Sequence, residues 1–218
     1  MTYPILYSFK RCPYAMRARM ALQLGKVKCE IREVKLSNKP DHMLEVSPKG
    51  TVPILILENK VIDESYDIVN WVIKKSNLFN NNLKSVQIDL TESLIKKFDD
   101  DFKHHLDRYK YATRYENSDS EFHKDECLKI LIDLEDIAAE DRWIFGEKLN
   151  KLDITILPFI RQFRIANPEW FDSLQEITKI KKILNNYLDS DEFQKIMIKY
   201  DQWKVGSEPI YFPSSNIE

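Results

Sequence analysis

The sequence predicts two parts of different fold class: an α/β part with a mixed four-stranded sheet over residues 1–76, then an all-helical part over residues 86–218. Up to residue 75, short β-prone runs alternate with helical patterns, whereas only helical patterns occur from residue 86 onward. The polar, Asn-rich stretch 77–85 between them is typical of a linker. A chain of 218 residues is long enough for one or two domains.

The order of elements in the first part determines the kind of sheet. The patterns predict a β-α-β unit, a short helix, a β-hairpin and a last helix. A β-α-β unit joins parallel strands by a right-handed crossover, and a hairpin is antiparallel, so the sheet is expected to be mixed. Gly25 is expected to close the first helix at its C′ position. The expected strands cover 3–9, 27–34, 54–57 and 61–62, and the expected helices 13–24, 37–45 and 64–75.

Apolar stripes at helical spacing mark the second part. The helix over 152–165 is apolar on most faces, which predicts a central position in a helical bundle. Asn150 is a good N-cap for it, and Asp153 stands at the N3 position of a capping box. The expected helices cover 86–106, 128–137, 152–165, 174–188 and 193–200, and an irregular tail follows Trp203.

Composition excludes several function classes. The net charge of −2 gives no global basic field for nucleic acid. Only 4 glycines argue against a glycine-rich phosphate loop, and no apolar run approaches the ~20 residues that span a bilayer. The N-terminus lacks the pattern of a signal peptide, and three cysteines form no even framework. We therefore expect a cytoplasmic protein that binds neither nucleic acid nor membrane.

The segment from the first strand into the first helix contains the strongest chemical signal. Pro13 fits the first helical turn, which places Cys12 at the N-cap. There the unpaired N–H groups and the helix dipole favour a thiolate, and Lys10 and Arg11 add to the same field. A lone cysteine is more often a buried apolar residue, but this strand–Cys-Pro–helix setting favours a nucleophile.

Two further segments suggest a ligand. In Thr51–Pro53 the X-Pro bond before a strand is a candidate cis bond that leaves the backbone of Val52 available to an extended peptide; the alternative is a plain strand-entry proline. Ser65 offers a hydroxyl and N–H groups to a carboxylate and Glu64 can accept from an ammonium, although helix capping alone is equally favoured. Lys39 alone would be a solvated lysine. A thiol, a peptide backbone and an amino-acid head together describe glutathione.

These segments resemble those of the glutathione transferase family, most closely its cysteine-type, omega-like members and their bacterial relatives. The similar segments are Arg11–Arg17, Asn38–Pro40, Ser47–Pro53, Asp63–Ser65 and Leu152–Phe163, in family order and at family spacing over nearly the whole chain. The resemblance implies a thioredoxin-like first domain, a helical second domain, a homodimer, glutathione as co-substrate and no metal.

The resemblance also implies roles for single residues. Cys12 would form a mixed disulfide with glutathione, Lys39 would contact the glycyl end, and Val52 the cysteinyl backbone. Glu64 and Ser65 would hold the γ-glutamyl end. The glutathione-binding set is then Lys39, Thr51, Val52, Pro53, Glu64 and Ser65.

The predicted chemistry is glutathione-dependent thiol–disulfide exchange. The segment Cys12–Ala15 has no second cysteine, so a second glutathione must resolve the intermediate, and burial is expected for Cys29 and Cys127. Conjugation or dehalogenation of small electrophiles would need a hydroxyl, for which Tyr7 and Ser8 are candidates. A non-catalytic interaction module of the same fold is the third alternative.

A pocket for the second substrate, a small electrophile or a mixed disulfide, is expected between the two parts, since ligand sites favour such boundaries. Its candidate lining residues are Tyr14, Tyr109, Tyr111 and Trp170.

Overall fold

The computed structural model describes residues 3–80, 83–116 and 119–214, and it divides the chain into two compact units. The first unit contains residues 1–80 and 190–218, and the second contains residues 81–189. The sequence-based division ended the first part at residue 76 and assigned 86–218 to the helical part, whereas these compact units group the C-terminal segment with the first unit. Of the expected linker 77–85, residues 81–82 lie outside the described residues.

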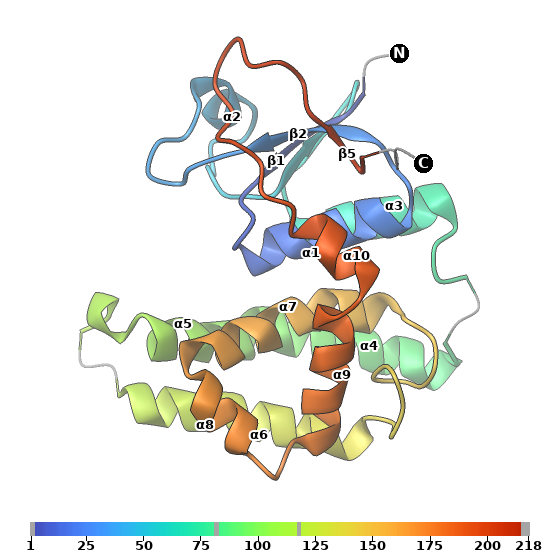
Figure 1. Cartoon of the computed structure of the whole chain (residues 1–218), viewed down its shortest axis with the longest axis vertical. Helices are drawn as coiled ribbons and strands as arrows, with labels where there is room; N and C mark the ends of the chain where they lie inside the picture. Colours follow the sequence, from blue (N-terminus) through green and yellow to red (C-terminus); the bar gives the residue numbers. More distant parts are fainter. Residues whose placement is uncertain (1–2, 81–82, 117–118, 215–218) are drawn as a thin grey trace. The chain divides into compact units, whose positions relative to one another are not determined.

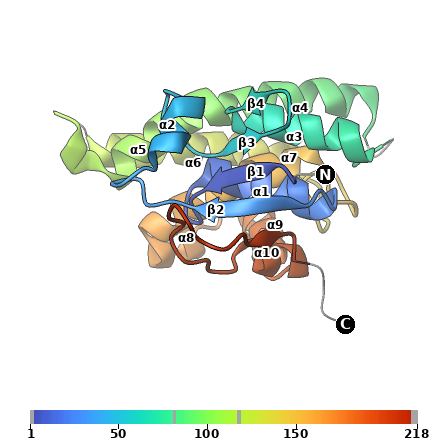
Figure 2. The ribbon, with the colours of Figure 1, turned by 90° about the horizontal axis from the view of Figure 1, so that it is seen from above.

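The sheet of the first unit is mixed, as predicted, and contains a fifth strand that was not predicted. Its strands are β1 (Ile5–Ser8), β2 (Cys29–Glu33), β3 (Ile54–Ile56), β4 (Val61–Ile62) and β5 (Tyr211–Phe212), in the order β4-β3-β1-β2-β5. Only β1 and β2 run parallel, and Figure 2 shows β4, β3, β1 and β2 in this order. Because β5 is two residues long, it has no alternating pattern; it pairs with β2 within a tail that is otherwise irregular over 204–210, as the sequence predicted.

The helices of the first unit are α1 (Pro13–Leu24), α2 (Asp41–Val46), α3 (Ser65–Ser76) and α10 (Asp191–Ile196). Helices α1 and α3 lie on the same face of the sheet and pack against each other (Figure 1). The last helix was expected over 193–200 and is shorter.

Gly25 serves close packing instead of the expected C′ role. It is the C-cap of α1 with a right-handed φ of −75°, and the following Lys26 takes the left-handed φ of 51°. A Cβ on Gly25 would lie 2.6 Å from Cγ1 of Val72 and 2.9 Å from Oγ of Ser76. A glycine therefore allows α1 and α3 to approach each other at this point.

A buried arginine on α1 joins the C-terminal segment to the sheet. Arg19 is fully buried; its Nε donates to Oγ of Ser8 at 2.8 Å, and Nη1 donates to the carbonyl of Ile196 at 2.9 Å. Its remaining nitrogen forms an ion pair with Glu33 on β2. A buried guanidinium must be paired and hydrogen-bonded, so these contacts place α10 in the first unit.

The second unit is helical. Its elements are α4 (Ser85–Lys97), the π-helical segment η1 (Phe98–Phe102), α5 (Lys103–Lys110), the 3₁₀ turn η2 (Ala112–Arg114), α6 (Ser120–Ile137), α7 (Lys151–Ala166), α8 (Pro168–Ser173) and α9 (Thr178–Leu188). Helix α7 is buried along most of its length and contacts α4, α5, α8 and α9, which confirms its predicted central position. The helix expected over 174–188 begins only at Thr178, and residues 174–177 connect it to the short helix α8.

The buried stripe of the helix expected over 86–106 begins later than that range. Val86 is 76% exposed, and the first buried side chains are Thr91 and Ile95. The stripe reaches Phe98 and Phe102 through the π-helical segment, which has a wider turn than an α-helix. Among the residues that the structure describes, no helix is long and apolar enough to cross a membrane.

Candidate functional site

Cys12 stands at the N-terminus of α1, as the sequence predicts. It is the N-cap with extended backbone (φ −76°, ψ 124°), and Pro13 follows at the first helical position. Its N–H donates to the carbonyl of Phe9 at 3.0 Å, which turns the chain from β1 into the helix. No side chain caps this helix end, and no acidic residue lies in its first turn. The N–H groups and the positive end of the dipole therefore act on the half-buried thiol.

The thiol faces a pocket formed by the first unit. This pocket has a volume of about 260 Å³. Sγ of Cys12 lies 3.7 Å from the carbonyl oxygen of Val52, and the Val52–Pro53 bond is cis, as its sequence position suggested. Since the β1–β3 ladder begins at Ile54, the backbone of Val52 lies outside it. The lining residues are Cys12, Tyr14, Leu36, Lys39, Gly50, Thr51 and Val52.

Lys39 and Gly50 pack together at the side of this pocket. Gly50 has a φ of +61°, and a Cβ there would lie 3.3 Å from Nζ of Lys39 and 3.1 Å from Cδ2 of Leu44. A glycine thus provides both the left-handed backbone and the space for the ammonium group. Lys39, a solvated lysine on sequence grounds alone, lines the pocket; Leu36 and Gly50 were not predicted, although Gly50 lies in a segment singled out for the ligand.

The start of α3 holds the remaining predicted ligand contacts, Glu64 and Ser65, and it does not line the pocket. The side chain of Glu64 does not cap the helix but pairs with Lys49, and Oγ of Ser47 donates to Oδ2 of Asp63 at 2.7 Å. The two bonds join the start of α3 to the segment that leads into the pocket.

The other two cysteines are buried. Burial raises the pKa of Cys29 to about 12, although Arg19 opposes this, and burial also raises the pKa of Cys127. Sγ of Cys127 lies 3.7 Å from the carbonyl of Phe102 in the second unit. Neither thiol is suited to be a nucleophile.

The two residues before Cys12 contact other parts of the first unit, Lys10 through its backbone and Arg11 through its guanidinium. The Lys10 N–H donates to Glu33 at 2.6 Å, and the charge of Lys10 lowers the pKa of that carboxyl against the larger effect of burial. The Arg11 guanidinium lies 5.3 Å from the ring centroid of Phe9.

The two hydroxyls considered for conjugation, Tyr7 and Ser8, are fully buried. The Tyr7 hydroxyl lies 2.8 Å from Nδ1 of His42 and accepts from Arg32 at 3.0 Å, while Ser8 accepts from Arg19 at 2.8 Å. Burial raises the pKa of Tyr7. Both hydroxyls are therefore part of the first unit's interior hydrogen bonding.

The aromatic residues predicted for the second substrate have separate surroundings. Tyr14 lines the Cys12 pocket. In the second unit, Tyr109 and Trp170 each pack on Phe163 at 5.6 Å between ring centroids, whereas Tyr111 is exposed. A shared pocket formed by these residues stays a prediction.

Comparison with known proteins gives consistent matches. The family model for the glutathione S-transferase N-terminal domain matches residues 6–79. Glutathione S-transferase L1 of Arabidopsis thaliana is 28% identical over 212 residues, which cover 93% of this chain and 82% of that protein. Glutathione S-transferase omega-2 of Rattus norvegicus is 38% identical over 64 residues, which cover 29% and 25%. A glutathione transferase family member from Pseudomonas fluorescens pf-5, solved with two glutathione bound, has a TM-score of 0.77 at 16% identity and covers 89% of this chain and 92% of its own.

Proposed function

We propose that this chain, which belongs to the glutathione S-transferase family, uses Cys12 as the nucleophile of glutathione-dependent thiol–disulfide exchange. One observation carries the proposal: the Cys12 thiol lies at an uncapped helix N-terminus and faces a pocket, while Cys29 and Cys127 are buried. The partial match to an omega transferase is consistent with it.

In the first step, the Cys12 thiolate attacks the glutathione sulfur of a mixed disulfide. A Cys12–glutathione disulfide forms, and the former partner leaves as a thiolate that takes up a proton. The α1 N-terminus stabilises the attacking thiolate, because the thiol is at the N-cap position, at the positive end of the helix dipole, and no acidic residue lies in the first turn.

In the second step, the thiolate of free glutathione attacks the glutathione sulfur of the Cys12 disulfide. Oxidised glutathione leaves and the Cys12 thiolate is restored, so the two steps together convert one mixed disulfide and one glutathione thiol into oxidised glutathione and one free thiol. Cys29 cannot substitute for the second glutathione, because it is buried and its pKa is about 12.

In this proposal, glutathione lies in the Cys12 pocket and extends to the start of α3. The ammonium of Lys39 attracts the glycyl carboxylate, and the backbone of Val52, flanked by Thr51 and Pro53, pairs with the cysteinyl backbone. The N–H groups at Ser65 and the carboxylate of Glu64 receive the γ-glutamyl end.

The buried hydroxyls make conjugation the weaker alternative, because Tyr7 and Ser8 are hydrogen-bonded inside the first unit. A homodimer in the cytoplasm stays part of the proposal.

The test is glutathione-dependent reduction of a small glutathionyl mixed disulfide by wild type, Cys12→Ser and Cys29→Ser. We expect Cys12→Ser to lose at least about 100-fold in turnover, because no other accessible thiol can form the intermediate. Cys29→Ser is the matched control and should keep its activity. Equal turnover by wild type and Cys12→Ser would remove Cys12 as the nucleophile. Retention of both proteins on glutathione-agarose without turnover would instead favour a non-catalytic role.

A further inference from the structure

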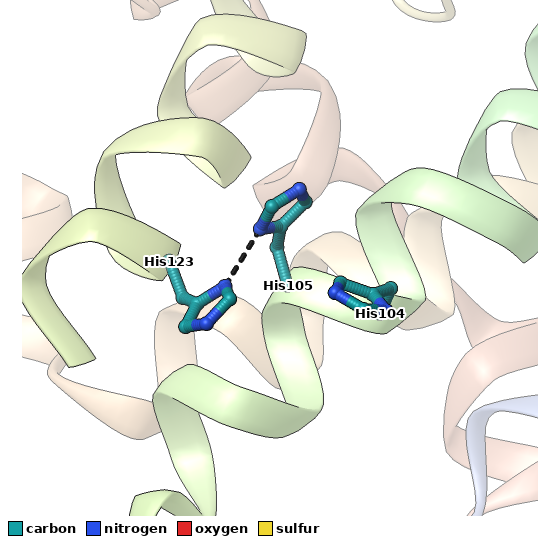
Figure 3. Close-up of side chains that lie close together, drawn as sticks. All are labelled: His104, His105 and His123. Carbon is teal, nitrogen blue, oxygen red and sulfur yellow. Dashed lines mark hydrogen bonds between the residues drawn. The ribbon is translucent and has the colours of Figure 1, made fainter. Parts of the chain in front are cut away.

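Three of the four histidines meet in the second unit. His104 and His105 lie on α5 and His123 on α6, and each offers a ring nitrogen within 4.8 Å of the others. Figure 3 shows the three rings grouped between the two helices, with Nδ1 of His105 and Nδ1 of His123 joined at 2.7 Å. The positions are 18 residues apart in the chain, so only the packing of α5 on α6 forms this group.

The helix that carries two of these histidines is irregular just before them. The π-helical segment Phe98–Phe102 ends where α5 begins, and the buried stripe then continues to Leu106. His105, next to Leu106, is half-buried and reaches His123, which is 9% exposed, while His104 is exposed. Wider helical turns of this kind are frequent at functional sites. The cluster is therefore closed on one side and open to solvent at His104.

The cluster favours neutral imidazoles, which is the form that binds metals. Nδ1 of His105 and Nδ1 of His123 can share only one proton, since a second would bring two N–H groups face to face. Burial, followed by the neighbouring His104, lowers the pKa of His105. Burial, followed by Arg108, lowers the pKa of His123.

Charged groups of both signs surround the rings. Asp101 and Glu126 act to raise the pKa of His105, and Asp119 and Glu126 that of His123, so three carboxylates favour a cation here. Arg108 opposes it; its Nη1 lies 3.0 Å from Nδ1 of His104. A cation at His104 therefore requires this guanidinium to move aside.

We propose that His104, His105 and His123 bind a divalent transition metal, Zn²⁺ being the best fit. Three imidazoles with one position left for water is a common zinc coordination. In a tetrahedral site the ligand nitrogens lie about 3.3 Å apart, between the 2.7 Å and 4.8 Å limits of this cluster, so rotation of the rings is sufficient. The metal takes the place of the shared proton, which moves to Nε2 of the same imidazole, and links α5 to α6. This departs from the expectation of a protein without metal and is independent of Cys12.

The experiment is a Zn²⁺ titration of the full chain after removal of metals by a chelator, with a chromophoric chelator as competitor. We expect one Zn²⁺ per chain and an affinity at least about tenfold lower in His104→Gln/His105→Gln, which removes two ligands. His42→Gln is the matched control, because His42 is the only histidine outside the cluster, and it should bind as wild type does. Equal affinity in wild type and the double variant would overturn the proposal.

Three further measurements test whether the metal is bound by the three histidines. Cys12→Ser should bind Zn²⁺ like the wild type, and loss of binding in this variant would assign the metal to the thiol. Co²⁺ should give the visible absorption of a tetrahedral site without a thiolate charge-transfer band. Because His104 is exposed, His104→Gln alone is expected to fold, and unchanged affinity in this variant, with a circular dichroism spectrum like that of wild type, would count against a three-histidine site.

Discussion

The N-termini of α1 and α7 begin with different N-cap residues and have opposite roles. At α7, the side chain of Asn150 accepts from the N–H of Leu152 at 2.8 Å, and Asp153 accepts from the N–H groups of Asn150 at 2.8 Å and Ile144 at 2.9 Å. Asn150 and Asp153 are fully buried. At α1, the N-cap Cys12 makes no side-chain cap bond and borders a pocket.

The difference shows that an N-cap residue can indicate either a helix start that stabilises the fold or one that is available to a ligand. A helix start whose N–H groups are satisfied by its own side chains stabilises the fold and offers nothing to a ligand. A helix start that lacks such acceptors keeps its N–H groups and its dipole for an anion, at some cost in stability. Each prediction below tests one side of this comparison.

The largest expected effect is on thiol reactivity. At pH 7 we expect iodoacetamide to modify Cys12 at least about 10³-fold faster than Cys29 in the native protein, because a thiol with a pKa of about 12 is almost never a thiolate at that pH. Peptide mapping by mass spectrometry at successive times measures both rates. In urea the difference should disappear. Similar rates for the two cysteines in the native protein would mean that the N-terminus of α1 does not increase the reactivity of Cys12.

The second effect is a pH dependence of stability that comes from Asp153. Burial raises its pKa to about 7, against two N–H donors that lower it. Between the unfolded value of about 4 and this value, the native state holds a proton that the unfolded state lacks, so the free energy of unfolding should fall as pH rises, by on the order of 4 kcal/mol in total.

Urea unfolding of wild type and Asp153→Asn from pH 4 to pH 8 checks this expectation. The variant has no titrating group at this position. The free energy of unfolding of the wild type minus that of the variant should therefore fall as the pH rises. Parallel curves for the two proteins would show that the two N–H donors keep Asp153 ionised throughout.

A third, smaller effect distinguishes the loss of stability caused by alanine at a positive φ from an effect on glutathione binding. Gly50→Ala and Gly206→Ala both place alanine at positive φ, +61° and +85°, and each should lose about 1–2 kcal/mol of stability. A Cβ at position 50 would lie 3.3 Å from Nζ of Lys39, whereas a Cβ at position 206 would meet open space. Gly50→Ala alone should therefore raise the KM for glutathione. An equal rise in both variants would remove Lys39 from the glutathione site.

The smallest effect is a gain in stability. Cys12→Ser places a good N-cap at the start of α1, and we expect it to raise the free energy of unfolding by about 0.5–1 kcal/mol while turnover is lost. The control is Ser190→Ala at the start of α10, whose side chain accepts from the N–H of Phe193 and whose loss should cost a similar amount. A destabilised Cys12→Ser would mean that the thiol contributes packing that serine cannot replace.

The local parts of the fold and of the site could be predicted from the sequence. The Cys-Pro helix start, the cis Val52–Pro53 bond and the capping box at Asn150 each depend on residues within a few positions of one another. The lining of the pocket by Lys39 could not be derived that way, because it depends on the packing of Lys39 next to Gly50, which is 11 positions away in the chain. Gly25 shows the same limit, since its role comes from Val72 on another helix.

By itself the sequence determined the two kinds of architecture, the mixed pairing of the first four strands and the nucleophile candidate Cys12, because periodicity and helix-end chemistry are local. Tertiary structure alone decided that residues 190–218 join the first unit, through Arg19 and strand β5. It also brought together His105 and His123, which no motif connects. Both depend on contacts between residues distant in the chain, and a pattern read along the chain carries no information about such contacts.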